Sequence, residues 1–188
     1  AGMDIAGTTD QCHYMYKQVS GNVEIIARVN SIANTSTSAK AGVMIRSALT
    51  NNSANVLMAL TQAKSFRFQS RLTTGGTTTA VTGTGSLPYW VKIIRRSNTF
   101  YGYRSADGVA WTYVGTVKIP MGTSVYVGLA ATSVRSQGLT SAAFDKLSIN
   151  ALAPYEKLLV DNVDVEFSVV GSWSTGTSPA GFYGTNYR

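Results

Sequence analysis

The sequence predicts an all-β protein, folded as an antiparallel β-sandwich. Residues that favour strands dominate, because the 188 residues include 10 Tyr and 6 Phe together with many Val, Ile and Thr. Apolar residues nowhere follow the helical period over several turns. Short extended runs recur instead about every 8 to 14 residues, with turn residues between them, as they do in sandwiches. We therefore expect strands joined by hairpins.

About eleven runs carry this pattern. In chain order they are residues 12–19, 23–32, 41–49, 56–62, 65–72, 77–83, 89–96, 99–105, 111–117, 125–132 and 139–149. Turn chemistry separates them, because Gly21, Gly75 and Gly108 each stand where a hairpin needs a positive φ. Pro88 precedes the run at 89–96, where its missing N–H is not required. This order predicts a meander of antiparallel strands.

The chain divides by charge into a basic body and an acidic tail. Residues 1–150 contain 14 Lys and Arg against 5 Asp and Glu, whereas residues 151–188 contain 2 against 4. We expect a sandwich at 1–150, a linker at 151–157 and an incomplete second module at 158–188. The cations of the body are spread over many strands and only Arg95 and Arg96 are adjacent, so nucleic-acid binding is not expected.

Long apolar segments and paired cysteines are both missing from the sequence. No stretch approaches the roughly 18 apolar residues of a membrane span, and the first residues lack the regions of a signal peptide. We expect a soluble chain without membrane insertion, whose export signal lies upstream of Ala1. Cys12 is the single cysteine, so no disulfide can form within the chain. Its place in an apolar-alternating run predicts a buried structural thiol.

Several spaced motifs of the body occur in an order known from one fold family. They include "DIAGTTDQCHYMYKQV", "KAGVMIRSAL", "PYWVKIIRR" and "VYVGLAATS". Together they resemble the concanavalin A-like, laminin-G-like β-sandwich modules described as DUF1349-related, which occur in large secreted or surface proteins of bacteria. The resemblance covers residues 4–149 and implies a jelly-roll sandwich outside the cell. In that family a further strand usually precedes the first motif, so we expect the body to be one strand short.

The tail, "VDNVDVEFSVVGSWSTGTSPAGFYGTNYR", resembles the first strands of a golvesin or xanthan-lyase C-terminal-like domain. The resemblance implies carbohydrate binding by the complete domain. Within the tail, Val163, Val165, Phe167 and Val169 alternate with polar residues, which predicts one β-strand. We expect this strand to pair with an exposed sheet edge, either of its own body or of a neighbouring copy.

Catalytic residues are not evident in the sequence. Glycoside hydrolases of this fold need two carboxylates about 5 to 10 Å apart, usually from an E-x-D-x-x-E run, and the acids of the body have no such spacing. His13 is the only histidine, and a catalytic triad would need an acid and an activated hydroxyl beside it. Its strand is expected to be buried, which predicts a structural role. We therefore expect that the chain is not an enzyme.

Metal binding has little support from residue spacing. The chain has no Cys/His cluster for zinc. Asp4, Asp10, Asp161 and Asp164 could offer oxygen ligands to Ca²⁺, but no loop has the D-x-D-x-D-G spacing of a calcium loop. We expect no cofactor, with Ca²⁺ as the alternative.

Carbohydrate recognition is the binding function that the composition serves best. Sugars present flat C–H faces and hydroxyl groups, so their sites combine aromatic rings with amides and guanidinium groups. The candidate ligands are Tyr89, Trp90, Tyr101 and Tyr103 as stacking platforms, and Gln69, Arg71 and Arg95 for the hydroxyls. Aromatic residues that alternate along strands also form core and cross-strand pairs, which is the alternative role for these positions.

Two functions therefore remain open at this point. The first is a non-catalytic extracellular module that recognises a polysaccharide or a cell-surface glycan within a larger protein. The second is a structural subunit of an extracellular filament or array, a homopolymer assembled head to tail by donation of the C-terminal strand. Particle size in solution distinguishes a monodisperse module from an open-ended polymer.

Overall fold

The computed structural model describes residues 2–136 and 138–154. The predicted strand at Val163, Val165, Phe167 and Val169, and the candidate calcium ligands Asp161 and Asp164, lie outside these residues. Within them, no helix is long and apolar enough to cross a membrane. One compact unit ends at Leu152, two residues into the predicted linker.

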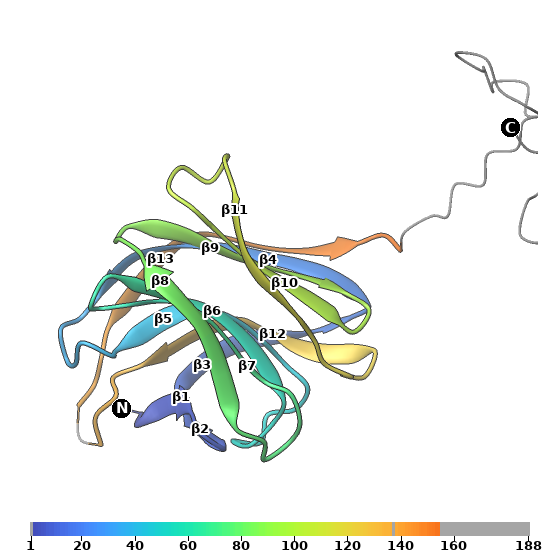
Figure 1. Ribbon diagram of the computed structural model, residues 1–188, viewed down its shortest axis with the longest axis horizontal. Helices are drawn as coiled ribbons and strands as arrows, with labels where there is room; N and C mark the ends of the chain where they lie inside the picture. The colour runs from blue at the N-terminus through green and yellow to red at the C-terminus, as the bar shows by residue number, and fades with distance from the viewer. Residues whose placement is uncertain (1, 137, 155–188) are drawn as a thin grey trace, which may run out of the picture. The chain divides into compact units, whose positions relative to one another are not determined.

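The described residues form an antiparallel β-sandwich, as the sequence predicts (Figure 1). The five-stranded sheet has the order β11 (Thr112–Lys118), β10 (Thr99–Ser105), β9 (Tyr89–Arg96), β4 (Asn22–Ile32), β13 (Ala142–Leu152). The six-stranded sheet has the order β3 (His13–Ser20), β12 (Ser124–Thr132), β5 (Lys40–Arg46), β6 (Asn55–Thr61), β7 (Ser65–Arg71), β8 (Thr78–Thr84). Each of the predicted runs overlaps one of these strands.

A small hairpin, β1 (Asp4–Ala6) with β2 (Thr9–Gln11), completes the fold. It lies on the side of the six-stranded sheet that faces away from the five-stranded sheet (Figure 1). Its strands are three residues long, too short for an alternating pattern to predict them.

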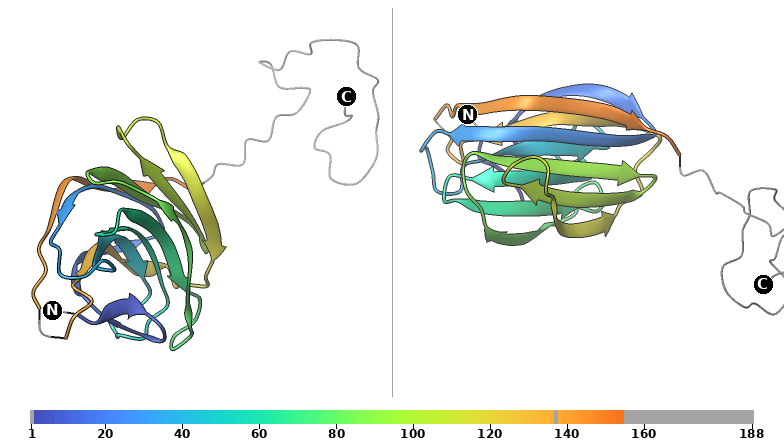
Figure 2. Two further views of the ribbon diagram at one scale, coloured as in Figure 1. Left: turned by 60° about the vertical axis from the view of Figure 1, so that its left-hand side comes forward. Right: turned by 90° about the horizontal axis from the view of Figure 1, so that it is seen from above.

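The main core lies between the two sheets, which pack face to face (Figure 2). Alternate residues of each strand point inward, so Val23, Ile25, Ala27 and Val29 of β4 are fully buried. The other sheet contributes the inward rows of its central strands, namely Ala41, Val43, Ile45, Val56, Met58, Leu60, Phe66, Phe68, Val125, Val127 and Leu129.

A second, smaller core lies under the hairpin. Ile5 of β1 packs on Met44, Leu57, Ala59 and Ala130, which point outward from the six-stranded sheet. Strands β5 and β6 are therefore covered on both faces, and every residue in them is buried. Burial on both faces explains why these strands are nearly continuous apolar runs instead of alternating ones.

Glycines occupy the left-handed turn positions that the sequence predicts, but the turn at Gly21 does not form a hairpin. Gly21 joins β3 to β4 with a φ of 82°, and Gly108 follows β10 with a φ of 79°. Side chains disfavour this left-handed backbone, which glycine adopts without strain. Gly108 turns β10 back onto β11, which is a hairpin as predicted. The turn at Gly21 instead carries the chain from the six-stranded sheet to the five-stranded sheet, where β4 pairs with β9 and β13. The predicted meander is therefore wrong at this point, because β3 and β4 lie in facing sheets that close around the core.

Candidate functional site

The hairpin is fixed to the six-stranded sheet by a buried carboxylate. Arg71 of β7 donates two hydrogen bonds to Asp10 of β2, from Nη2 to Oδ1 at 2.6 Å and from Nη1 to Oδ2 at 2.9 Å. Asn55 of β6 donates a third, at 3.1 Å, and Nη2 of Arg46 lies 3.4 Å from the same carboxylate. A buried charge is tolerated only when it is paired in this way. The hairpin therefore has a defined position on the outer face of the sheet.

An open hollow of about 380 Å³ adjoins the hairpin on this face. Its lining combines three kinds of group: aromatic rings, amides and a guanidinium group. The lining residues are Asp10, Gln11, Cys12, Tyr14, Tyr16, Arg46, Leu49 and Asn51. Gln11 and Asn51 are exposed and have amide groups for hydrogen bonds with a ligand.

Three tyrosines form a continuous aromatic surface beside this hollow. Tyr14 and Tyr16, two residues apart on β3, stack with ring centroids 5.3 Å apart. Tyr126 of β12 meets Tyr16 edge to face at 5.4 Å. The hydroxyl of Tyr14 donates to the carbonyl of Met44, and the guanidinium of Arg46 lies 5.9 Å from the Tyr14 ring centroid. Tyr14 is thus held in place, while 47% of Tyr16 remains accessible.

Two groups of the hollow, the Cys12 thiol and the Tyr14 hydroxyl, are neutral at physiological pH. Burial, together with the charge of Asp10, raises the pKa of the Cys12 thiol to about 11, although Arg46 opposes the shift. Burial also raises the pKa of Tyr14 well above its usual value. Since a thiolate is the nucleophilic form of cysteine, Cys12 is an inert neutral group here.

Sequence reasoning missed this tyrosine surface, although part of its signal was available. Tyr14 and Tyr16 alternate in the run 12–19, which places them on one face of a strand. Tyr126 joins them through pairing alone, because Tyr16 lies opposite Gly128 and Tyr126 lies opposite Gln18. That pairing brings together residues more than a hundred positions apart.

Three of the four predicted aromatic ligands share the outer face of the five-stranded sheet. Tyr101 lies opposite Ile94 and Tyr103 opposite Lys92, and Trp90 is on the same face as Lys92. Tyr89 points to the other face and packs against the main core. The structure therefore brings Trp90, Tyr101 and Tyr103 to one surface and separates Tyr89 from them.

A lysine occupies the centre of that surface. The Nζ atom of Lys92 lies 3.9 Å from the ring centroid of Trp111 and 4.9 Å from that of Tyr103. Burial lowers the pKa of Lys92, and Glu24, 4.0 Å away, opposes the shift. Tyr113 meets Tyr103 edge to face at 5.7 Å and is the most exposed aromatic residue here. One face of Trp111 and of Tyr103 is thus engaged by a cation.

The three polar residues predicted to bind hydroxyls are buried and bonded internally. Gln69 donates from Nε2 to the carbonyl of Ile5 at 2.5 Å, and Arg71 is paired with Asp10. Arg95 donates to the carbonyls of Gly21, Ser97, Met121, Gly122 and Thr123, which fixes the turns at that end of the sandwich. All three are at most 2% accessible, so their side chains have structural partners in place of a solvent-facing ligand.

Two other expectations about single residues need revision. His13 is exposed on β3, not buried, because no strand of the described residues covers its side of the sandwich. Cys12 is half-buried at the edge of the hollow. Of the candidate calcium ligands, Asp4 accepts a hydrogen bond from Lys40 and Asp10 from Arg71, and the described residues contain no cluster of three acidic, His or Cys side chains.

No family model and no curated protein matches this chain. Solved structures match it in fold. A functionally unknown protein from Saccharomyces cerevisiae is 18% identical, with a TM-score of 0.61 over 76% of each chain. A xylan β-1,4-xylosidase from Bacillus halodurans is 18% identical, with a TM-score of 0.54 over 74% of this chain and 30% of the enzyme. A family 7 alginate lyase with bound product is 13% identical, with a TM-score of 0.53 over 77% of this chain and 76% of the lyase.

These likenesses confirm the sandwich fold and are consistent with a concanavalin A-like module. No family model supports the narrower DUF1349-related assignment. The expectation that the chain is not an enzyme is contradicted, because the structures that share its fold include a xylosidase and an alginate lyase, which are catalytic proteins. The missing E-x-D-x-x-E run was therefore too narrow a criterion for the chemistry that this fold can accommodate. The identities are low, and the likeness extends to the fold alone.

Proposed function

We propose that this protein recognises a polysaccharide at the tyrosine surface of Tyr14, Tyr16 and Tyr126 and the adjoining hollow. The observation that carries the proposal is the combination of an accessible aromatic ring with exposed amides at one open cavity. Sugar sites need this combination, because the C–H face of the ring stacks on an aromatic plane while the hydroxyls need hydrogen-bond partners. The solved structures of similar fold include proteins named for xylan and alginate, which supports the ligand class.

The parts of the site have distinct roles in this proposal. Tyr16 and Tyr126 are the stacking platform, since Tyr14 is held from behind by its bond to the carbonyl of Met44. Gln11 and Asn51 bind hydroxyls at the rim of the hollow. Arg46 is fixed by hydrogen bonds to the carbonyls of Ala48 and Thr50 and orients the Tyr14 ring.

We place this activity outside the cell, within a larger secreted or surface protein. The resemblance of the body to modules of such proteins supports this location. The net charge of +7 also favours an acidic polymer, such as alginate, over a neutral one at low ionic strength.

The test is affinity electrophoresis of the full chain through gels that contain alginate, xylan or no polymer. We expect retardation of the wild type, and a two- to tenfold weaker affinity for Tyr16→Ala, about the contribution of one aromatic contact. Tyr126→Ala should weaken binding in the same way. The matched control is Tyr113→Ala, which removes an exposed tyrosine from the opposite sheet and should leave the affinity unchanged.

The outcomes separate the two aromatic surfaces. If Tyr113→Ala weakens binding and Tyr16→Ala does not, the ligand lies on the five-stranded sheet, at the residues predicted from the sequence. If the wild type migrates alike in every gel, the proposal is wrong. Assays for released reducing ends and for unsaturated uronate in the same mixtures show whether binding is accompanied by cleavage.

A further inference from the structure

The two sheets leave the sandwich open along one side. β3 is an end strand of the six-stranded sheet and β13 is an end strand of the five-stranded sheet. Among the described residues, β3 pairs only with β12 and β13 only with β4. Each therefore has a free edge of backbone N–H and C=O groups, which is a template for another strand.

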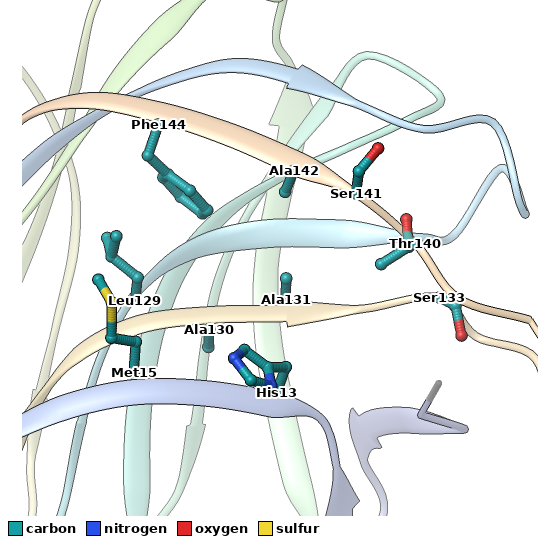
Figure 3. A pocket seen from close by; sticks show the side chains of 10 residues that line it. All are labelled: His13, Met15, Leu129, Ala130, Ala131, Ser133, Thr140, Ser141, Ala142 and Phe144. Carbon is teal, nitrogen blue, oxygen red and sulfur yellow. The ribbon is translucent and has the colours of Figure 1, made fainter.

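An apolar groove of about 490 Å³ runs between these two end strands. Phe144 and Ala142 of β13 point across it toward Leu129 and Ala131 of β12, and Met15 of β3 lies on the same side (Figure 3). The groove continues past His13, Ser133, Thr140 and Ser141. Its floor is thus part of the sandwich interior that is open to solvent.

The interior face of β3 is uncovered. Met15 lies opposite Leu129, so both point to the same side of the sheet, yet 56% of Met15 is accessible against 8% of Leu129. A methionine on the inward face of a sandwich strand is normally covered by the facing sheet. One added strand at this position would cover it.

The edge of β3 is better suited to a new strand than that of β13. β3 keeps an unbroken register with β12 from His13 to Ser20. β13 bulges between Asp145 and Ser148, where Lys146 has a φ of 53°. A bulge interrupts the regular row of donors and acceptors that pairing requires.

We propose that this groove accepts residues 158–170 of a second copy of the chain, added as a strand at the free edge of β3. The apolar side chains of that segment, Val163, Val165, Phe167 and Val169, supply the inward row that Met15 lacks. Charge favours the match, because the segment contains three acids and no cation, whereas the exposed residues of the two end strands include Lys17 of β3 and Lys146 of β13.

The sequence that follows β13 favours a second copy of the chain as the donor of the strand. Pro154 follows Leu152 closely, and a proline holds the preceding residue in an extended conformation. Residues 151–158, "ALAPYEKL", contain no Gly, Asn, Asp or Ser, whereas the turns after β3 and β10 contain Gly21 and Gly108. This stretch after β13 therefore lacks the glycine or asparagine that takes the left-handed position in a tight reversal. Donation from copy to copy does not close on itself and produces a head-to-tail chain.

The test compares the full chain with two variants that each disable one side of the contact. Met15→Glu places an acid in the acceptor groove at a position that is 56% accessible in the single chain. A double variant, Val165→Asp with Phe167→Asp, disables the donor segment. Met3→Glu is the matched control, because Met3 is 49% accessible and lies outside the groove.

Sedimentation velocity over a range of concentrations gives the result. We expect wild type and Met3→Glu to form species that grow with concentration, and both disabled variants to remain monomers of 20.0 kDa. An equimolar mixture of the two disabled variants retains one intact donor and one intact groove, so it should stop at a heterodimer. A monomeric wild type, or polymers that Met15→Glu leaves intact, would overturn the proposal. The proposal would also be overturned if the wild type were a monomer and both disabled variants were less stable than it by the same amount. That result would mean that the segment pairs with β3 of its own chain.

Discussion

Asp10 and Arg71, 61 positions apart in the chain, form a two-pronged ion pair with both side chains sealed from solvent. Removing the cation by Arg71→Met leaves the carboxylate buried, with Asn55 and Arg46 as its remaining neighbours. We expect the free energy of unfolding to fall by about 3 to 5 kcal/mol. Urea denaturation followed by tryptophan fluorescence measures this loss.

The matched control for that variant removes both charges. In Asp10→Leu combined with Arg71→Met the buried carboxylate is removed as well, and Arg46 keeps its hydrogen bonds to the carbonyls of Ala48 and Thr50. The double variant should therefore be more stable than Arg71→Met alone. Equal losses in the two proteins would show that the pair does not hold the hairpin by charge.

A second ion pair, between the buried Lys40 and the partly exposed Asp4, should make stability depend on pH. Burial lowers the pKa of Lys40, and the hydrogen bond that its ammonium donates to the Asp4 carboxylate, at 2.6 Å, opposes the shift. Asp4→Asn removes the opposing charge, so the folded variant loses the Lys40 proton at a lower pH than its unfolded chain does. At neutral pH we expect the free energy of unfolding of the variant to be about 1 to 3 kcal/mol lower than that of wild type. This difference should become smaller as the pH rises toward 10, because the buried amine is then neutral and is tolerated without a partner. An equal difference in the free energy of unfolding between variant and wild type at pH 7 and at pH 10 would contradict the prediction.

Two glycines without positive φ give a test of strand spacing. A Cβ at Gly42 would lie 2.1 Å from the carbonyl oxygen of Met58 on β6, so backbone must move. Gly42→Ala should therefore cost about 1 to 3 kcal/mol. Gly122→Ala is the control, since nothing lies within 4 Å of that Cβ and the change should stay within about 0.5 kcal/mol. Thermal unfolding of both variants measures the difference.

Cys12 predicts a loss of stability at alkaline pH. Its pKa is about 11 in the folded chain and 9.0 in the reference state. Below pH 9 the thiol is protonated in both states; between pH 9 and 11 the unfolded chain loses the proton first, so stability falls as pH rises. This group accounts for a loss of about 2 to 3 kcal/mol by pH 11. Unfolding curves of wild type and Cys12→Ala should diverge accordingly over that range, whereas parallel pH profiles would show that the thiol ionises freely.

The strand positions were predictable because their causes are local. Apolar residues at every second position, and a glycine at the left-handed residue of turns such as Gly21 and Gly108, act within a few residues of each other. The convergence of Trp90, Tyr101 and Tyr103 on one sheet face followed in part from the same alternation. The sequence by itself thus determined an all-β, antiparallel sandwich and most of its strand boundaries.

The tertiary structure decided which polar residues face solvent and where the sandwich is open. Arg71 and Gln69 were predicted as ligands, but they are buried because the hairpin at Asp10 and Ile5 folds over them from more than 60 positions away. Tyr126 reaches Tyr16, and Met15 faces an open groove, through the pairing of β3 with β12 and the position of β13. These relationships depend on contacts between segments far apart in the chain. Local periodicity contains no information about such contacts, whereas the closure of two sheets around a core determines them.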